Sequence, residues 1–246
     1  MVLNLLFLQV PEAHMTRALT ARRLISVSAL AWLSLSVAAS ATSPGTPEDE
    51  MLRRATRVFA RAVATPAAAI PAAVLMRATA VAVIPAAVKD GTRYRGIGVL
   101  SVRGARPDLW GPPAIVTLEG SIPLNLEPDV LDFVVVARTS RGADYLVQPH
   151  SPIPAPRSMS MTAGSLGHTT PVQTDADLVA YVQFGDYFAG VTVENWTIRE
   201  EPLLNEALYG RPYTTDDIVR RAGFFRLPSA AREWRDVIGD YFREMS

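Results

Sequence analysis

The fold is decided by the stretch from Ala80 to Leu100, Ala-Val-Ala-Val-Ile-Pro-Ala-Ala-Val-Lys-Asp-Gly-Thr-Arg-Tyr-Arg-Gly-Ile-Gly-Val-Leu. A small apolar run comes first and a basic turn follows at residues 89–95. Gly96 and Gly98 then open a second apolar run. Glycine permits a positive φ or a close backbone approach, and the β-branched residues around these two glycines favour a strand. The stretch predicts two strands joined by a positively charged turn.

Short β-type segments recur after this stretch, at residues 114–118, 131–137, 158–162, 178–184 and 188–193. Turn-forming residues separate them. Arg141-Gly142 is one such turn, and Gly185-Asp186 predicts a hairpin. Four prolines between residues 149 and 157 exclude a central strand and indicate an extended surface loop. The close spacing of the segments favours antiparallel pairing, because parallel pairs need longer crossovers.

Helical patterns flank this β-rich region. Thr46 can cap a helix that begins at Pro47 and ends before Pro66. Its apolar face would comprise Met51, Leu52, Ala55, Val58, Phe59, Ala62 and Val63. A short helix is expected at residues 72–78 and another at 216–221, the latter capped by Thr215. A last helix would begin at Ser229, with a core-facing stripe of Trp234, Val237, Ile238, Tyr241, Phe242 and Met245.

Together these patterns predict an α+β fold. We expect a curved, mostly antiparallel sheet of short strands, with helices at the N-terminal side and an amphipathic helix at the C-terminal end. The 246-residue chain is apolar enough for one substantial core. It holds no cysteine, which excludes disulfides, thiolate metal sites and a cysteine nucleophile.

The first 41 residues have the order of a secretory signal peptide. Arg22 and Arg23 precede an apolar run at residues 24–37, and a small-x-small site, Ala39-Ser40-Ala41, follows. The run is shorter than the ~18 residues usually needed to span a bilayer, although an uncleaved anchor is the alternative. Met15 is a more natural start than Met1. We therefore predict a Sec-type signal at 1–41, a linker at 42–47, a single domain at 48–246, and a periplasmic or secreted protein.

Charge is polarised along the chain although it balances overall. Residues 51–106 hold ten basic residues and one acidic residue, whereas residues 107–210 hold four basic and thirteen acidic ones. A one-sided positive field would attract anionic partners. The first helix is basic and amphipathic, so it either lies on an anionic membrane surface or packs on its own domain. The candidate lipid-binding residues are Arg53, Arg54, Arg57, Arg61, Lys89, Arg93 and Arg95.

Seven segments in one order resemble a known family. They begin at Ala80 (Ala-Val-Ala-Val-Ile-Pro), Gly96 (Gly-Ile-Gly-Val-Leu), Trp110 (Trp-Gly-Pro-Pro-Ala), Asp132 (Asp-Phe-Val-Val-Val), Thr162 (Thr-Ala-Gly-Ser-Leu-Gly), Asp186 (Asp-Tyr-Phe-Ala-Gly-Val) and Asn205 (Asn-Glu-Ala-Leu-Tyr-Gly). The chain is thereby similar, over about residues 66–222, to the SYLF-domain family of bacteria and eukaryotes, which includes yeast actin-patch proteins. The resemblance implies lipid or membrane binding through a basic patch and an N-terminal amphipathic helix. Actin binding belongs to eukaryotic members and is not carried over.

The leading hypothesis is a non-enzymatic module that contacts anionic phospholipid. Phe59 and Met51 would insert only if the first helix leaves the rest of the domain. A structural or partner-binding envelope protein is the alternative, with an aromatic interface of Tyr181, Phe184, Tyr187, Phe188 and Trp196. A serine hydrolase is a third hypothesis, with Ser165 as nucleophile and His150 or His168 as base, but Ala163 stands where a nucleophile elbow needs glycine. No metal-binding motif or phosphate loop appears, so we expect no cofactor and no metal. Nucleic acid is not an expected partner, and the oligomeric state is open.

Overall fold

A long hairpin forms the centre of the sheet, as the sequence predicts. Strand β1 (Ala80–Asp90) pairs with β2 (Arg93–Val102) in antiparallel register across a two-residue turn, in which Gly91 has a φ of 61°. The computed structural model describes residues 45–64, 70–106, 108–122, 128–148, 176–191, 194–220 and 226–245. The predicted signal peptide, the strand at 158–162 and the proline-rich loop lie outside these residues.

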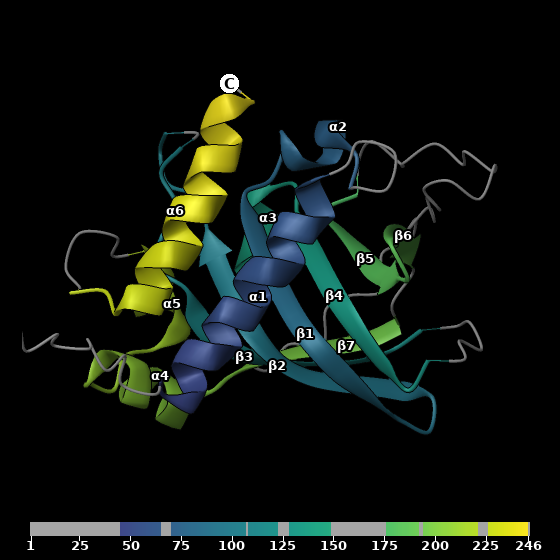
Figure 1. Cartoon of the computed structure of the whole chain (residues 1–246), viewed down its shortest axis with the longest axis horizontal. Coiled ribbons are helices and arrows are strands. Elements are labelled where there is room, and N and C mark those ends of the chain that lie inside the picture. Colours follow the sequence, from purple (N-terminus) through teal and green to yellow (C-terminus); the bar gives the residue numbers. More distant parts are fainter. Residues whose placement is uncertain are drawn as a thin grey trace, which may run out of the picture. The chain divides into compact units, whose positions relative to one another are not determined.

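Seven antiparallel strands make an open sheet in the order β6-β5-β4-β1-β2-β3-β7 (Figure 1). The other five are β3 (Ala114–Ser121), β4 (Val130–Ala137), β5 (Leu178–Phe184), β6 (Tyr187–Val191) and β7 (Glu194–Glu200). The α+β class, the antiparallel pairing and the hairpin at Gly185-Asp186 are therefore confirmed. Strand β7 was not among the sequence predictions.

Helices cover one side of this sheet, which we call the outer face. Helix α1 (Pro47–Ala64) and helix α6 (Ser229–Glu244) lie side by side over it (Figure 1). The Thr46 hydroxyl accepts a hydrogen bond from the Asp49 N–H at 3.2 Å, which confirms the predicted cap. The Phe59 ring is fully buried and meets the rings of Trp234 and Tyr241 edge-on, with centroids 5.8 and 5.9 Å apart. The apolar face of α1 thus packs within its own domain.

The opposite, inner face of the sheet packs on two short helices, α3 (Ser140–Val147) and α5 (Thr215–Arg220). The Phe133 ring of β4 lies 5.7 Å from the Tyr94 ring of β2 and 6.1 Å from the Trp196 ring of β7. Three strands separate β4 from β7 in the sheet. Contact across them requires strong curvature, as predicted.

A bulge in β1 exchanges the two faces of that strand. Before it, the even-numbered residues up to Ile84 face the inner core, whereas odd-numbered Ala87 does so after the register shift. Ala86 has a φ of 51°, a left-handed conformation that is uncommon for alanine. Its N–H donates a hydrogen bond to Oδ1 of Asp132 at 2.7 Å. The bulge therefore turns Val88 to the outer face.

Glycine on β2 allows the bulge to fit. A Cβ atom on Gly98 would lie 2.0 Å from the Val83 carbonyl oxygen, and one on Gly96 would lie 2.8 Å from the Ala87 Cβ. Any side chain at Gly98 would therefore force the two strands apart. Gly96 and Gly98 therefore serve close strand approach, which is one of the two roles that the sequence left open.

Three sequence predictions need correction. Arg141-Gly142 is not a turn but the start of α3, which Thr139 caps by accepting a hydrogen bond from the Gly142 N–H at 3.1 Å. The second helix, α2 (Ala72–Leu75), is shorter than predicted. The cap near α5 is Thr214, whose hydroxyl accepts from the Asp217 N–H at 3.1 Å, while Thr215 is already helical.

Helix α4 (Pro202–Tyr209) was also missed, although its motif was noticed. The buried Asn205 side chain accepts a hydrogen bond from the Ile115 N–H at 2.7 Å and donates one to its carbonyl oxygen at 3.1 Å. The Tyr209 hydroxyl donates to the Pro113 carbonyl oxygen at 2.6 Å. The Asn-x-x-x-Tyr-Gly segment thus fastens α4 to β3.

Candidate functional site

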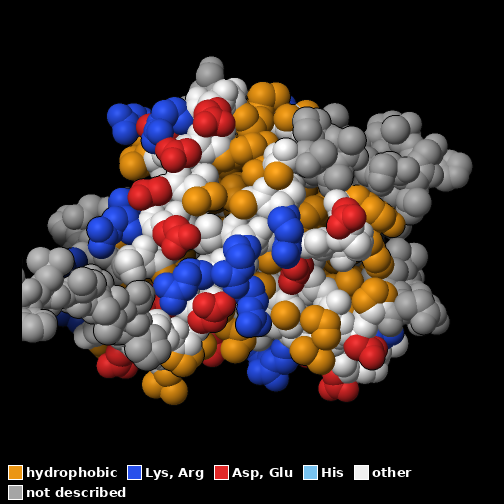
Figure 2. All heavy atoms as spheres, in the orientation of Figure 1, with side chains coloured by type: hydrophobic (Ala, Val, Ile, Leu, Met, Phe, Trp, Pro, Cys, Tyr) orange, Lys and Arg blue, Asp and Glu red, His pale blue; other side chains and the backbone are white. Residues whose placement is uncertain are grey.

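Helix α1 presents a ridge of arginines to solvent. Arg54, Arg57 and Arg61 are exposed and Arg53 is half-buried, while Leu52, Ala55, Val58, Phe59 and Ala62 are buried on the other side. The 3.6-residue repeat of the helix produces this division. Basic side chains accordingly gather over α1 in the middle of the face drawn in Figure 2.

Two carboxylates neutralise part of this ridge. Glu50 lies 3.6 Å from Arg53 and 3.0 Å from Arg57, and the hydrogen bond from Arg57 holds the pKa of Glu50 below its usual value. Arg61 donates to Asp132 of β4 at 2.8 Å. Among the described residues, Arg54 makes no ion pair. The ridge therefore keeps a positive balance.

The basic turn contributes to the same side of the sheet, in part. Strand alternation places Arg93 and Arg95 on the outer face with α1, because Tyr94 between them faces the inner core. Lys89 lies opposite Tyr94 in the register and so belongs to the inner side. The structure brings six of the seven predicted residues to the outer face and places Lys89 on the other.

A further arginine joins them through a shared acid. Glu119 of β3 forms ion pairs with Arg93 and with Arg199 of β7, each at 2.9 Å. Sequence analysis missed Arg199 because β7 was not predicted and its surroundings are acidic. A charged residue alternating with Trp196 and Ile198 in residues 194–200 was the available signal.

We define the arginine face as the seven arginines on this side, Arg53, Arg54, Arg57, Arg61, Arg93, Arg95 and Arg199. Carboxylates stand among them, including Glu50, Asp90, Glu119 and Asp132, so the positive charge of this face is partly neutralised. Acidic side chains lie over α6 beyond the ridge (Figure 2). The positive field is therefore strongest over α1 and the neighbouring part of the sheet.

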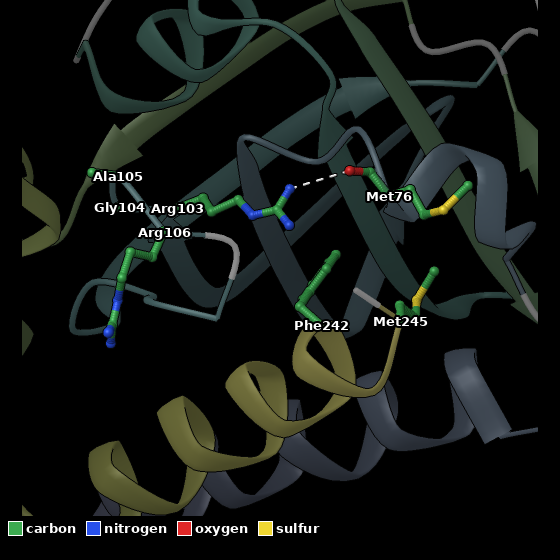
Figure 3. Close-up of a pocket in the computed structure, with 7 residues that line it drawn as sticks. All are labelled: Met76, Arg103, Gly104, Ala105, Arg106, Phe242 and Met245. Atoms are coloured by element: carbon green, nitrogen blue, oxygen red, sulfur yellow. Dashed lines mark hydrogen bonds between the residues drawn. The ribbon is translucent and has the colours of Figure 1, made fainter.

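A pocket of about 440 Å³ opens between the end of β2, α2 and the last turn of α6. It is lined by Met76, Arg103, Gly104, Ala105, Arg106, Phe242 and Met245 (Figure 3). Arg103 donates to the carbonyl oxygens of Met76 and Ala78 at 3.2 and 3.0 Å, and its guanidinium lies 5.0 Å from the centre of the Phe242 ring. Burial lowers the pKa of Arg103. These contacts tie the end of β2 to α2 and α6.

The aromatic group predicted as an alternative interface is mostly core. Tyr181, Phe188 and Trp196 are buried, and burial raises the pKa of Tyr181 to about 12. Phe184 and Tyr187 are half-buried and stack with their ring centres 6.3 Å apart. Only these two stand at the surface near the β5–β6 turn.

The candidate catalytic residues Ser165, His150 and His168 lie outside the described residues, so the structure gives them no geometry. Within the described ranges, no cluster of three or more His, Asp or Glu side chains could hold a metal ion. No helix among those same residues is both long and apolar enough to cross a membrane.

Comparison with known proteins matches part of the chain to a protein family. A family model described as "Ysc84: Las17-binding protein actin regulator" matches residues 124–241. No curated protein matches the chain, and no solved structure does. The matched region begins just before β4 and ends within α6.

Proposed function

Because residues 124–241 of this chain belong to the Ysc84, or SYLF, family, we propose that the protein is a non-enzymatic module that binds anionic lipid surfaces through its arginine face. The observation that carries this proposal is the division of α1. Its apolar side is part of the core, while its other side presents four arginines beside three more from the sheet. The family is not known for catalysis.

The charge of the arginine face sets the expected strength. Each basic residue near an anionic bilayer contributes about 1 kcal/mol, and salt screens exposed charges within about 10 Å at 0.1 M. Seven arginines that carboxylates neutralise in part therefore support weak, reversible and salt-sensitive association. It is enough for a peripheral protein but not for permanent anchoring.

Vesicle flotation at several salt concentrations tests the proposal. The variant Arg53, Arg54 and Arg57→Gln removes three charges from the arginine face. The matched control, Arg106, Arg211 and Arg243→Gln, removes three exposed charges elsewhere. We expect the first variant to bind phosphatidylglycerol-containing vesicles about 100-fold more weakly and the control to stay within a few-fold of the original protein.

Equal binding to vesicles of pure phosphatidylcholine would overturn this proposal. Equal loss in both variants would also do so, because it would show an effect of overall charge and not of the arginine face. Circular dichroism of each variant separates lost binding from lost folding.

A protein partner is the second candidate function, favoured by the family description, which names Las17 binding for that family. For this chain the partner would be an envelope protein, not Las17 or actin. Chemical cross-linking in intact cells, compared between the original protein and a Phe184 and Tyr187→Ser variant, tests it. Cross-links that depend on these two residues would favour the partner over the lipid surface.

We also propose that residues 1–41 direct export, supported by the two arginines, the apolar run and the Ala39-Ser40-Ala41 site. N-terminal sequencing of the protein recovered from cell fractions tests this. A new N-terminus at Thr42 in the periplasmic or secreted fraction is the expected result. Recovery in the cytosol with an intact leader would contradict it.

A further inference from the structure

Three aliphatic side chains form an exposed group on the part of the outer face that α1 leaves uncovered. Val88 is 56% exposed, Val130 52% and Ile97 42%. They come from three different strands, β1, β4 and β2. We call these three residues the aliphatic patch.

The strand register makes the patch continuous. Val88 lies opposite Val130 on one side and opposite Arg95 on the other, and Arg95 in turn lies opposite Glu119. Ile97 follows Arg95 by two residues and so shares its face. One row across four strands therefore reads valine, valine, arginine, glutamate, with isoleucine beside the arginine.

The exposure of Val88 results from the bulge. Without it, the alternation of β1 would turn Val88 inward with Ile84. The bulge reverses the alternation, and it is held by the hydrogen bond from the Ala86 N–H to Asp132. The same Asp132 accepts from Arg61 of α1 at 2.8 Å, so the feature that exposes Val88 also joins the patch to the arginine ridge.

Arginines border the patch on two sides. Arg61 stands at its α1 side, and Arg93 and Arg95 stand at its β2 side. Apolar side chains lie beside basic ones on this uncovered part of the sheet (Figure 2). Asp90 lies opposite Arg93 at the outer end of this face, beside the β1–β2 turn.

We infer that the aliphatic patch is the part of this protein that enters the apolar layer of an anionic bilayer, while α1 stays docked on the sheet. This inference rests on the proposed lipid binding. The arrangement fits a lipid surface, since guanidinium groups would meet phosphates while the aliphatic side chains reach just below them. Protein interfaces concentrate their binding energy in Trp, Tyr and Arg anchors, whereas the centre of this patch is purely aliphatic.

The alternative is insertion of Phe59 and Met51, which requires that α1 leave the sheet. Phe59 has no exposed surface, and α1 would have to leave the sheet to release it. The rings and aliphatic side chains beneath α1, among them Trp234 and Ile238, would then face water. The aliphatic patch needs no such opening, because it is exposed already.

The first test replaces Val88, Ile97 and Val130 by Thr, which keeps the β-branched shape. The original protein should keep a salt-resistant fraction of binding to phosphatidylglycerol-containing vesicles, and the Thr variant should bind about tenfold or more weakly and lose that fraction. A matched control, Leu203→Thr, alters a side chain that is 79% exposed on α4 and should change nothing.

The second test uses the absence of cysteine from the chain, which allows single-site labelling. An environment-sensitive dye on Ile97→Cys should move to an apolar environment on vesicles, whereas the same dye on Leu203→Cys should not. Ala55→Cys, at a fully buried position on α1, reports undocking. Its thiol should stay protected from maleimide on vesicles if α1 remains in place.

The outcomes separate the two proposals. Binding that depends on anionic lipid but is unchanged in the Thr variant overturns the patch and leaves lipid binding intact. Reactive Ala55→Cys on vesicles shows that α1 opens and also overturns the inference. If the dye on Ile97→Cys becomes shielded with rising protein concentration alone, the occupant is a second copy and not a bilayer. Absence of any vesicle binding removes both proposals.

Discussion

Replacing Phe59 by Ala tests whether α1 belongs to the core. The Phe59 side chain has no exposed surface and meets the rings of Trp234 and Tyr241. A buried Phe→Ala change usually costs about 3–5 kcal/mol, and the aromatic contacts place this site toward the upper value. A single domain has only about 5–15 kcal/mol of stability. We expect a large drop in the urea midpoint, followed by tryptophan fluorescence because Trp234 contacts the mutated site.

The energies of burial and of charge can be compared for α1 docked on the sheet and for α1 detached from it. Burial of Leu52, Val58 and Phe59 stabilises α1 by about 1.5–3 kcal/mol each, or about 5–9 kcal/mol together. Four arginines on an anionic surface contribute only about 4 kcal/mol, so their charge alone does not offset this burial. Leu203→Ala, at an exposed site, should stay within about 0.5 kcal/mol. A loss below about 1 kcal/mol for Phe59→Ala would refute the argument that α1 is core.

Three other predictions follow from the same contacts. Gly98→Ala places a Cβ 2.0 Å from the Val83 carbonyl oxygen, so urea unfolding should show a loss of stability of about 3 kcal/mol or more. The control Gly91→Ala, at a turn with open space, should lose only about 1–2 kcal/mol in the same measurement. Burial opposes ionisation of Asp177, but hydrogen bonds from Thr139 and Arg141 outweigh it and hold its pKa below the usual value. The stabilisation from the ionised Asp177 is present above the unfolded-state pKa of about 4 and is lost as pH falls through the folded-state pKa. The urea midpoints of the original protein and of Asp177→Asn should therefore converge in acid. Asp132→Asn keeps an acceptor for the Ala86 N–H but removes a carboxylate from the arginine face, so vesicle binding should tighten about fivefold, and unchanged binding would show that Asp132 lies outside the contact.

The sequence predicted the elements whose signals are local. The apolar stripe of α1, its Thr46 cap, the β1–β2 hairpin and the β5–β6 turn depend on residues close together in the chain. Helix α3 was read as a turn because Gly142 suggested one. Glycine is used there for another reason, since a Cβ would lie 2.4 Å from the Asp177 carbonyl oxygen, a contact that comes from 35 residues away.

The candidate site was predicted in composition but not in arrangement. Helical spacing placed the four α1 arginines on one side of the helix. The face of the sheet on which Lys89 lies depends on the bulge in β1, which no local sequence pattern predicts. Arg199 and the aliphatic patch were missed because cross-strand neighbours are set by register. Asn205 was noticed as part of a motif, yet its role as a clamp on Ile115 joins residues 90 positions apart.

The bulge at Ala86 has a consequence for how β1 can change. Upstream of Ala86 the strand follows one reading frame of alternation, and downstream it follows the other. Removing the extra residue at the bulge would leave Ala87 inward and Val88 outward in regular alternation, whereas removing a residue elsewhere in β1 would turn one part of the strand to the opposite face. The length of β1 on either side of the bulge is therefore under tighter constraint than its composition, and an insertion or deletion in those parts should do more harm than most substitutions.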